Sequence, residues 1–287
     1  MKANLLIVGM ILAVGMASSH PASAQTLRYS TFTIPGAQST EALGINDSGA
    51  YSGVYTDSGG VVHCFLLVGR TVTNINDPNG TSSTCYGLNN ANQVVGSYAL
   101  PTAFSNGFVY SNGGYTDIIV PTATAGTVAV ANNNVGGVVG YFADNIGTHG
   151  FYYNGSTYQQ LDVPGAAASL ATGINDGGMI TLQVITSGGS IESAIYNGHS
   201  YRILDVPGAV TSGVHQINNR GQIVYTWTDS DSVSHGALYS QGQFYTLDVP
   251  GASGTHADGI NSTGVIAGPW TPMNTTNFKS YKASRVP

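Results

Sequence analysis

Four side chains whose types suit metal binding or acid–base chemistry occur at matched positions before a repeated asparagine. Glu41 and His256 lie five residues before a copy of this asparagine, and His215 and Asp258 lie three residues before one. Carboxylates and imidazoles bind divalent metal ions, and they also donate and accept protons near neutral pH. In another copy of the repeat, Tyr86 lies three residues before the asparagine. If the fold brings these residues together, they predict a ligand-binding or acid–base site, with a divalent cation as one candidate occupant.

The asparagine belongs to a repeat that fills most of the chain. Prolines recur every 43 residues, and the asparagines recur every 42 to 44 residues. The prolines are Pro35, Pro78, Pro121, Pro164, Pro207 and Pro250, and the asparagines are Asn46, Asn89, Asn133, Asn175, Asn218 and Asn261. A period of this size indicates a repeat protein in which each unit is one small supersecondary structure.

Each repeat has the pattern of four short antiparallel strands. The asparagine begins a polar turn such as GINDSG, which is typical of a hairpin because glycine accepts the left-handed backbone that closes it. A second turn, a strand such as HGFYY, a tight Asn-Gly turn and the strand YQQLDV follow. In that last strand Leu161 and Val163 alternate with polar residues, and Pro164 ends the strand because proline has no N–H for the ladder. The recurring sequence LDVPGA therefore marks the exit from one sheet.

The two ends of the repeat array complement each other. The last repeat lacks its fourth strand, whereas a segment with the right pattern, LRYSTFTIP, precedes the first repeat. Pairing of these ends would close a ring. An open β-solenoid does not need complementary ends, because its first and last repeats do not meet. The sequence therefore predicts an all-β, six-bladed β-propeller of four-stranded antiparallel blades over residues 25–287, a single domain whose N-terminal strand completes the C-terminal blade.

The first strand of each blade is expected to line the central channel. Four residues before the asparagine the residues are mostly small, which indicates packing, whereas those three and five residues before it vary in type. Varied positions are free to serve a ligand, so the channel candidates are Glu41, Tyr86, His215, His256 and Asp258. The alternative is that they are ordinary solvated residues, because no nucleophile-elbow or His-Glu-x-x-His motif accompanies them.

A second recurring position, nine residues after the asparagine, is mostly aromatic. The residues there are Tyr55, Tyr98, Phe142, Val184, Trp227 and Trp270. One aromatic face per blade would suit the stacking of sugar rings at a rim, and packing between blades is the alternative explanation. The histidines His63, His149 and His235 fall in alternate blades, so they point away from one another and are expected to bond within their own blades.

The motifs GINDSG, HGFYY, HGALYS and LDVPGA together resemble the bacterial extracellular HAF-repeat family over the whole repeat array. The match is incomplete, since Ala237 replaces the Phe after His235, and three other blades place Asn106, Glu192 and Lys279 at the His position. The resemblance implies secretion and a propeller-like fold. It supplies no catalytic residue.

Residues 1–24 have the layout of a secretory signal peptide, with Lys2, an apolar run and small residues before an expected cleavage after Ala24. No later segment approaches the roughly 20 apolar residues that cross a bilayer, so we expect a soluble exported protein, extracellular or periplasmic. The chain has 8 basic and 14 acidic residues, without the basic face of a nucleic-acid binder. An oxidising compartment permits one disulfide between Cys64 and Cys85, with two buried thiols as the alternative.

These features favour a secreted, monomeric, non-catalytic propeller that binds a ligand or a surface component, with a glycan as the leading candidate. The alternative is a metal-assisted hydrolase or lactonase with its site in the central channel. A structural component of a surface assembly is the second alternative. No cofactor is predicted.

Overall fold

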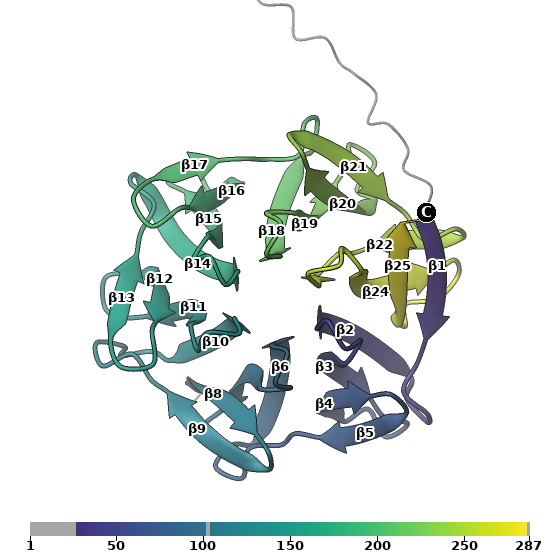
Figure 1. Ribbon diagram of the computed structural model, residues 1–287, viewed down its shortest axis with the longest axis horizontal. Coiled ribbons are helices and arrows are strands. Elements are labelled where there is room, and N and C mark those ends of the chain that lie inside the picture. Colours follow the sequence, from purple (N-terminus) through teal and green to yellow (C-terminus); the bar gives the residue numbers. More distant parts are fainter. Residues whose placement is uncertain (1–26, 102–103, 286–287) are drawn as a thin grey trace, which may run out of the picture.

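Six antiparallel sheets surround a central axis in the computed structural model (Figure 1), which describes residues 27–101 and 104–285. Every regular element within the described residues is a strand, so they contain no helix long and apolar enough to cross a membrane. Each blade has its own antiparallel strands, which follow one another from the axis outward. The prediction of an all-β, six-bladed propeller is confirmed. The predicted signal peptide, residues 1–24, lies outside the described residues.

The first three blades contain strands β2 to β13, in order from the axis outward. Blade 1 consists of β2 (Ser39–Ile45), β3 (Tyr51–Thr56), β4 (Val62–Val68) and β5 (Thr71–Asn74). Blade 2 consists of β6 (Ser82–Leu88), β7 (Val94–Ala99), β8 (Ser105–Ser111) and β9 (Gly114–Ile118). Blade 3 consists of β10 (Thr127–Asn132), β11 (Val138–Ala143), β12 (Thr148–Tyr153) and β13 (Tyr158–Leu161).

The second half of the ring follows the same order. Blade 4 consists of β14 (Ala166–Ile174), β15 (Ile180–Thr186), β16 (Ile191–Tyr196) and β17 (Tyr201–Ile203). Blade 5 consists of β18 (Thr211–Ile217), β19 (Ile223–Thr228), β20 (Ser234–Ser240) and β21 (Gln243–Leu247). Blade 6 consists of β22 (Ala252–Thr255) with β23 (Gly259–Ile260), then β24 (Ile266–Pro272), β25 (Lys279–Arg285) and β1 (Leu27–Phe32). Blades 3 and 4 share one continuous sheet only through a single parallel pair between β12 and β14.

The ring closes through the two ends of the repeat array. β1 pairs antiparallel with β25, from Leu27 opposite Arg285 to Phe32 opposite Ser280, and so supplies the outer strand of blade 6. The N–H of Thr40 on β2 also donates to the carbonyl of Phe278, at 3.0 Å. This is the closure that the complementary ends predict, and it joins the first blade to the last.

A hydroxyl group holds the turn at the exit of every blade. The N–H of the residue before the repeated proline donates to a Ser or Thr hydroxyl six or, in one turn, seven residues later, at 2.9–3.1 Å. The donors are Ile34, Asp77, Val120, Val163, Val206 and Val249, and the acceptors are Thr40, Ser83, Thr127, Ser169, Ser212 and Thr255. Each acceptor lies on the inner strand of the next blade, so the turn fixes the step between blades. We call the face of the ring that carries these turns the exit face.

A closed ring of asparagines surrounds the axis at the opposite face, which we call the asparagine face. Each anchor asparagine accepts hydrogen bonds through Oδ1 from its own turn, and its Nδ2 donates to the carbonyl of the next anchor asparagine. From Asn46 through Asn89, Asn133, Asn175, Asn218 and Asn261 back to Asn46, the six distances are 3.0, 3.1, 3.1, 3.2, 2.8 and 3.1 Å. All six residues are buried. This ring is the physical reason why the asparagine repeats.

Neighbouring blades also touch where the third strand of one meets the first strand of the next. A Cβ on Gly107 would lie 3.3 Å from the Cβ of Ala129, and one on Gly236 would lie 3.2 Å from that of Ala257, so glycine is needed for this close approach. At the interface of blades 4 and 5 a serine takes the same place, and the hydroxyl of Ser193 donates to the carbonyl of Ser212 at 2.9 Å. The small residues four before each asparagine are therefore contact points between blades.

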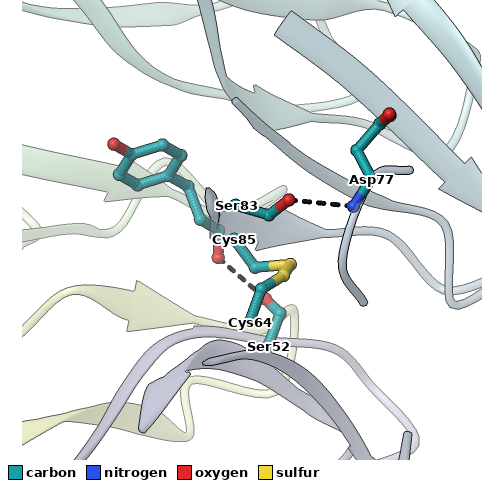
Figure 2. Close-up of a disulfide and its surroundings, with 6 residues drawn as sticks. Ser52, Cys64, Asp77, Ser83 and Cys85 are labelled. Atoms are coloured by element: carbon teal, nitrogen blue, oxygen red, sulfur yellow. Dashed lines mark hydrogen bonds between the residues drawn. A yellow bond between two sulfur atoms is a disulfide. The ribbon is translucent and has the colours of Figure 1, made fainter. Parts of the chain in front are cut away.

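Between blades 1 and 2 a disulfide occupies this contact point (Figure 2). Cys64 on β4 is bonded to Cys85 on β6, and both cysteines are fully buried. Of the two alternatives that the sequence leaves open, the structure therefore has the disulfide. It links residues 21 apart in sequence, and in the chain-entropy view closing a loop of this size stabilises the folded state by about 3 kcal/mol.

Removal of one ring asparagine should destabilise the whole propeller. In Asn218→Ala the N–H groups of Arg220 and Gln222 and the carbonyl of Asn261 lose their partner, so we expect the free energy of unfolding to fall by about 2–4 kcal/mol. Urea unfolding followed by tryptophan fluorescence measures this loss. Asn219 bonds only at the exposed surface, so Asn219→Ala is the matched control, expected within about 1 kcal/mol of the natural protein. Equal losses in the two variants would contradict the role of the ring.

Candidate functional site

A β-bulge in the inner strand directs one side chain of each blade toward the axis. In blades 1 to 5 the pairing register shifts just after the residue four before the anchor asparagine, at Ala42, Cys85, Ala129, Ala171 and Val214. A bulge leaves its extra residue out of the ladder and re-aims that side chain. In blade 6 the same strand is interrupted between β22 and β23, and Asp258 lies in the interruption. The position three before the asparagine therefore differs from its neighbours along the strand.

The central channel contains a cavity of about 270 Å³ that this position lines from all six blades. The residues at this position are Leu43, Tyr86, Val130, Thr172, His215 and Asp258, and Tyr141, Leu170, Gln183 and Gln216 complete the wall. Three of the predicted channel candidates, Tyr86, His215 and Asp258, thus line one cavity. Glu41 and His256 are not part of its wall. A partly apolar wall with a few converging polar groups is the setting typical of a small-ligand site.

His215 and Asp258 form the polar centre of the cavity. Nε2 of His215 lies 3.3 Å from Oδ1 of Asp258, an oxygen that makes no hydrogen bond within the described residues. Burial raises the pKa of Asp258 to about 6 and lowers the pKa of His215 to about 4. Between these two values a neutral carboxyl group faces a neutral imidazole. Groups whose pKa values are displaced in opposite directions from their usual ones are suited to acid and base roles.

Glu41 and His256 do not line the cavity, but burial and the charge of Asp258 act on the pKa of both side chains. Burial raises the pKa of Glu41, and the nearby charge of Asp258 adds to the rise. Burial also lowers the pKa of His256. Within residues 27–101 and 104–285, no three His, Cys, Asp or Glu side chains converge as a metal site requires. The divalent cation in the channel stays a prediction, and direct metal analysis of the purified protein can test it.

At the asparagine face the channel ends in a smaller space of about 60 Å³. Asp47 and Asp176 accept hydrogen bonds there from the side chains of Asn90, Asn134 and Asn219. Burial opposes the ionisation of both carboxyl groups, but the hydrogen bonds outweigh it, so the pKa of each is lowered. These two carboxylates are therefore engaged in the framework of the ring.

On the exit face, two recurring positions of the sequence meet in every blade. The residue nine after the anchor asparagine lies directly opposite the His position of the next strand. The six pairs are Tyr55 with His63, Tyr98 with Asn106, Phe142 with His149, Val184 with Glu192, Trp227 with His235 and Trp270 with Lys279. Each blade thus presents one aromatic or apolar residue beside one polar residue.

Aspartates hold the three histidines of these pairs. The imidazole nitrogens lie 2.9–3.3 Å from carboxylate oxygens of the same blade. His63 contacts Asp57, His149 contacts Asp144 and Asp162, and His235 contacts Asp229 and Asp248. The expectation that each histidine bonds within its own blade is confirmed. Sequence reasoning missed the aspartates that lie five or six residues before each histidine, although that spacing is the span of the hairpin between them.

Exposure separates the aromatic residues into two groups. Tyr98 and Phe142 are 3% and 1% exposed, which removes them from an aromatic rim. Tyr55, Trp227 and Trp270 stay partly exposed, and they belong to blades 1, 5 and 6, which are neighbours in the ring. The aromatic rim is therefore confined to one half of the exit face.

The two tryptophans are held by their polar partners. The rings of Trp227 and His235 stack with centroids 4.5 Å apart and planes 25° apart. Nζ of Lys279 lies 5.9 Å from the ring centre of Trp270, within the range of a cation–π contact. Neither indole Nε1 has a hydrogen-bond partner within the described part of the chain. Both Nε1 atoms are buried, so each tryptophan offers the partly exposed part of its ring to the exit face.

Comparison with known proteins identifies the fold. No family model matches this chain, and no curated protein matches it in sequence. Among solved structures, a TolB-assigned protein from Agrobacterium tumefaciens aligns with a TM-score of 0.59 at 13% identity, over 91% of this chain and 99% of its own. AofleA from Arthrobotrys oligospora, in a mutant form, aligns with a TM-score of 0.53 at 12% identity, over 91% of this chain and 87% of its own.

A variant of the Aleuria aurantia lectin, in complex with Fucα1-6GlcNAc, is also similar in structure. It aligns with a TM-score of 0.51 at 11% identity, over 87% of this chain and 96% of its own. At these identities the likeness shows a shared β-propeller fold. This chain is a β-propeller.

The buried carboxyl group of Asp258 should make stability depend on pH. Its pKa of about 6 in the folded protein exceeds that of an unfolded aspartate, about 4. The stabilisation from its bound proton is therefore complete below about pH 4 and is lost as the pH rises through about 6. We expect Asp258→Asn to gain stability relative to the natural protein across this window. Thermal unfolding of both proteins between about pH 4 and 8 measures the difference, and a difference that does not change with pH would contradict the assignment.

Proposed function

We propose that this protein binds a glycan on the exit face of blades 5 and 6. The observation that carries the proposal is a pair of partly exposed tryptophans on adjacent blades, Trp227 and Trp270. Trp227 lies opposite His235, and Trp270 lies opposite Lys279, so a basic side chain accompanies each indole. Sugar recognition needs a flat apolar surface against one face of the pyranose ring, with polar groups beside it for the hydroxyls. Both components are present in these two blades.

The polar partners in blade 5 are held in place before any ligand arrives. Asp229 and Asp248 flank His235 on its two nitrogens, at 3.2 and 3.1 Å. Burial lowers the pKa of His235, but the two carboxylates outweigh burial, so its pKa is raised. The imidazole that supports the indole of Trp227 is thus held by charge on both sides, and a preorganised site binds with a smaller loss of conformational freedom.

The structural neighbours support the same proposal. The Aleuria aurantia lectin carries Fucα1-6GlcNAc on a propeller of similar architecture, so such a ring is able to present a glycan site. The predicted signal peptide and the resemblance to a secreted repeat family agree with a protein that meets glycans outside the cytoplasm. Export, like the monomeric state, stays a prediction.

Glycan-array binding by the mature chain tests the proposal. We expect Trp227→Ala and Trp270→Ala each to weaken binding by about tenfold or more, because stacking on an aromatic ring contributes roughly 1–3 kcal/mol in comparable sites. Trp227→Phe is the matched control, since it keeps an aromatic face and should retain much of the affinity. Thermal unfolding shows whether each variant is folded. Absence of binding to every glycan, or full binding by a folded Trp227→Ala/Trp270→Ala double variant, would refute the proposal.

A second candidate function is a hydrolase or lactonase with its site in the channel. The observation that favours it is the pair of His215 and Asp258 in the cavity, with pKa values displaced in opposite directions. Such a pair is able to donate and accept a proton during attack of water on an ester or lactone. A divalent cation, if one binds in the cavity, would meet the imidazole of His215 and the carboxylate of Asp258 there.

Hydrolysis assays and metal analysis test this alternative. On the channel-hydrolase hypothesis, the purified chain cleaves small esters or lactones, and His215→Ala lowers kcat/KM by about 100-fold or more. Elemental analysis shows whether a divalent metal copurifies, and a fall of Tm with chelator shows whether it stabilises the folded protein. Equal activity in His215→Ala and the natural protein would exclude the channel pair as the catalytic site.

A further inference from the structure

One exit turn of the ring breaks the pattern that the other five follow. The residue before the repeated proline is aliphatic in five blades, and it is aspartate at Asp77. Asp77 is only 3% exposed, as deeply buried as the aliphatic residues at the same position. A buried carboxylate in a position built for a valine costs stability, so its presence points to a role outside folding.

Only one of the two oxygens of the Asp77 carboxylate accepts a hydrogen bond within the described residues. Oδ1 accepts the N–H of Asn79 at 2.9 Å, and the backbone N–H of Asp77 donates to Ser83, as it does in every other exit turn. Oδ2 is buried and has no hydrogen-bond partner within the described residues. Figure 2 shows the side chain of Asp77 directed away from the disulfide. One oxygen of this buried carboxylate is therefore left without a hydrogen-bond donor from the described residues.

A groove lies at this place between blades 1 and 2. It has a volume of about 660 Å³, and Asp77 is part of its wall together with His63, Asn76, Thr81, Ser82 and Thr84. Val61 and Val62, which are about half exposed, form an apolar edge. No lysine or arginine is among the described residues that line the groove. Its wall therefore offers hydroxyls, amides and a carboxylate, with no fixed cation to neutralise Asp77.

The disulfide fixes the two walls of this groove relative to each other. Cys64 directly follows His63 in blade 1, and Cys85 directly follows Thr84 in blade 2, so each cysteine is the neighbour of a lining residue. At the blade interface that carries the unusual aspartate, the blades are thus joined covalently. A groove with fixed walls and a buried unpaired acceptor has the features of a preformed site.

We propose that this groove binds a small polar ligand through a primary ammonium group, which pairs with Oδ2 of Asp77. An ammonium ion supplies three N–H donors and the positive charge that balances the negative carboxylate. The hydroxyl and amide groups of the wall suit a hydroxylated ligand, so an amino sugar is one source of the amine, and an alkyl amine is the other. The site lies between blades 1 and 2 and does not depend on the glycan site of blades 5 and 6.

Calorimetric titration with matched probes tests this proposal. Glucosamine and cadaverine carry the amine, and glucose and N-acetylglucosamine are the uncharged controls, all at about pH 6, where a primary amine is protonated. We expect an amine probe to bind at least about tenfold more tightly than glucose and N-acetylglucosamine. Tighter binding of glucosamine than of cadaverine identifies an amino sugar as the source, and the reverse identifies an alkyl amine. Failure of both amines to bind, or equal binding of glucose, would overturn the proposal.

Two variants of Asp77 separate binding from folding. Asp77→Val restores the residue type of the other blades, so we expect it to unfold at a higher temperature while losing amine binding by about tenfold or more. Asp77→Asn keeps the acceptor for Asn79 and removes the charge, and should lose binding to a similar extent. Asp205→Asn, on the far side of the ring, is the control and should bind as the natural protein does. A folded Asp77→Val that binds amines unchanged, or one that is less stable than the natural protein, would show that Asp77 serves the fold.

The two sites can be told apart in the same titrations. The Trp227→Ala/Trp270→Ala double variant should keep its affinity for the amine probes, because those residues lie in blades 5 and 6. Asp77→Val should keep its signals on the glycan array. Loss of amine binding in the tryptophan variant would contradict a separate site between blades 1 and 2.

Discussion

The closed ring of anchor asparagines is the constraint on which the rest of the structure depends. Each side chain both closes its own hairpin and reaches the next blade, so every hairpin at the asparagine face is tied to two neighbours. Because this chain of buried bonds has no end, no anchor asparagine is left with an unpaired side-chain amide or backbone carbonyl at its terminus. The ring sets the orientation of all six inner strands, and with it the positions of the side chains that line the channel.

The ring and the exit turns divide the residues of each repeat into two kinds. Anchor asparagines, exit hydroxyls and the small residues at blade contacts are fixed in type because they bond or touch the next blade. Positions such as His215 in the channel or Trp227 on the exit face bond to nothing that repeats. They are free to differ between blades, and the chemistry of the protein lies at these positions.

The sequence predicts the framework well and the sites poorly, for a physical reason. The spacing of the prolines and asparagines reveals the blade count, because each of these residues has the same structural role in every blade. The complementary ends of the repeat array reveal the closure by β1. Simple alternation places Glu41 and Leu43 on the same face, but the bulge at Ala42 separates them, and only the second lines the cavity. The pairing of Trp227 with His235 depends on the hairpin between them. Bulges and hairpin lengths are set by backbone geometry that the letters alone do not show.

Departures from the repeat are most informative where two of them coincide. Between blades 1 and 2 a carboxylate replaces a buried aliphatic residue, and a disulfide replaces the glycine–alanine contact found at other interfaces. The first change destabilises the interface, since a buried charge without a partner is unfavourable. The second stabilises the same interface by restricting the unfolded chain. Each change alone would be a local irregularity. Together they describe an interface that tolerates an unpaired carboxylate because a covalent bond offsets its cost, which is the arrangement expected of a binding site rather than of a packing defect.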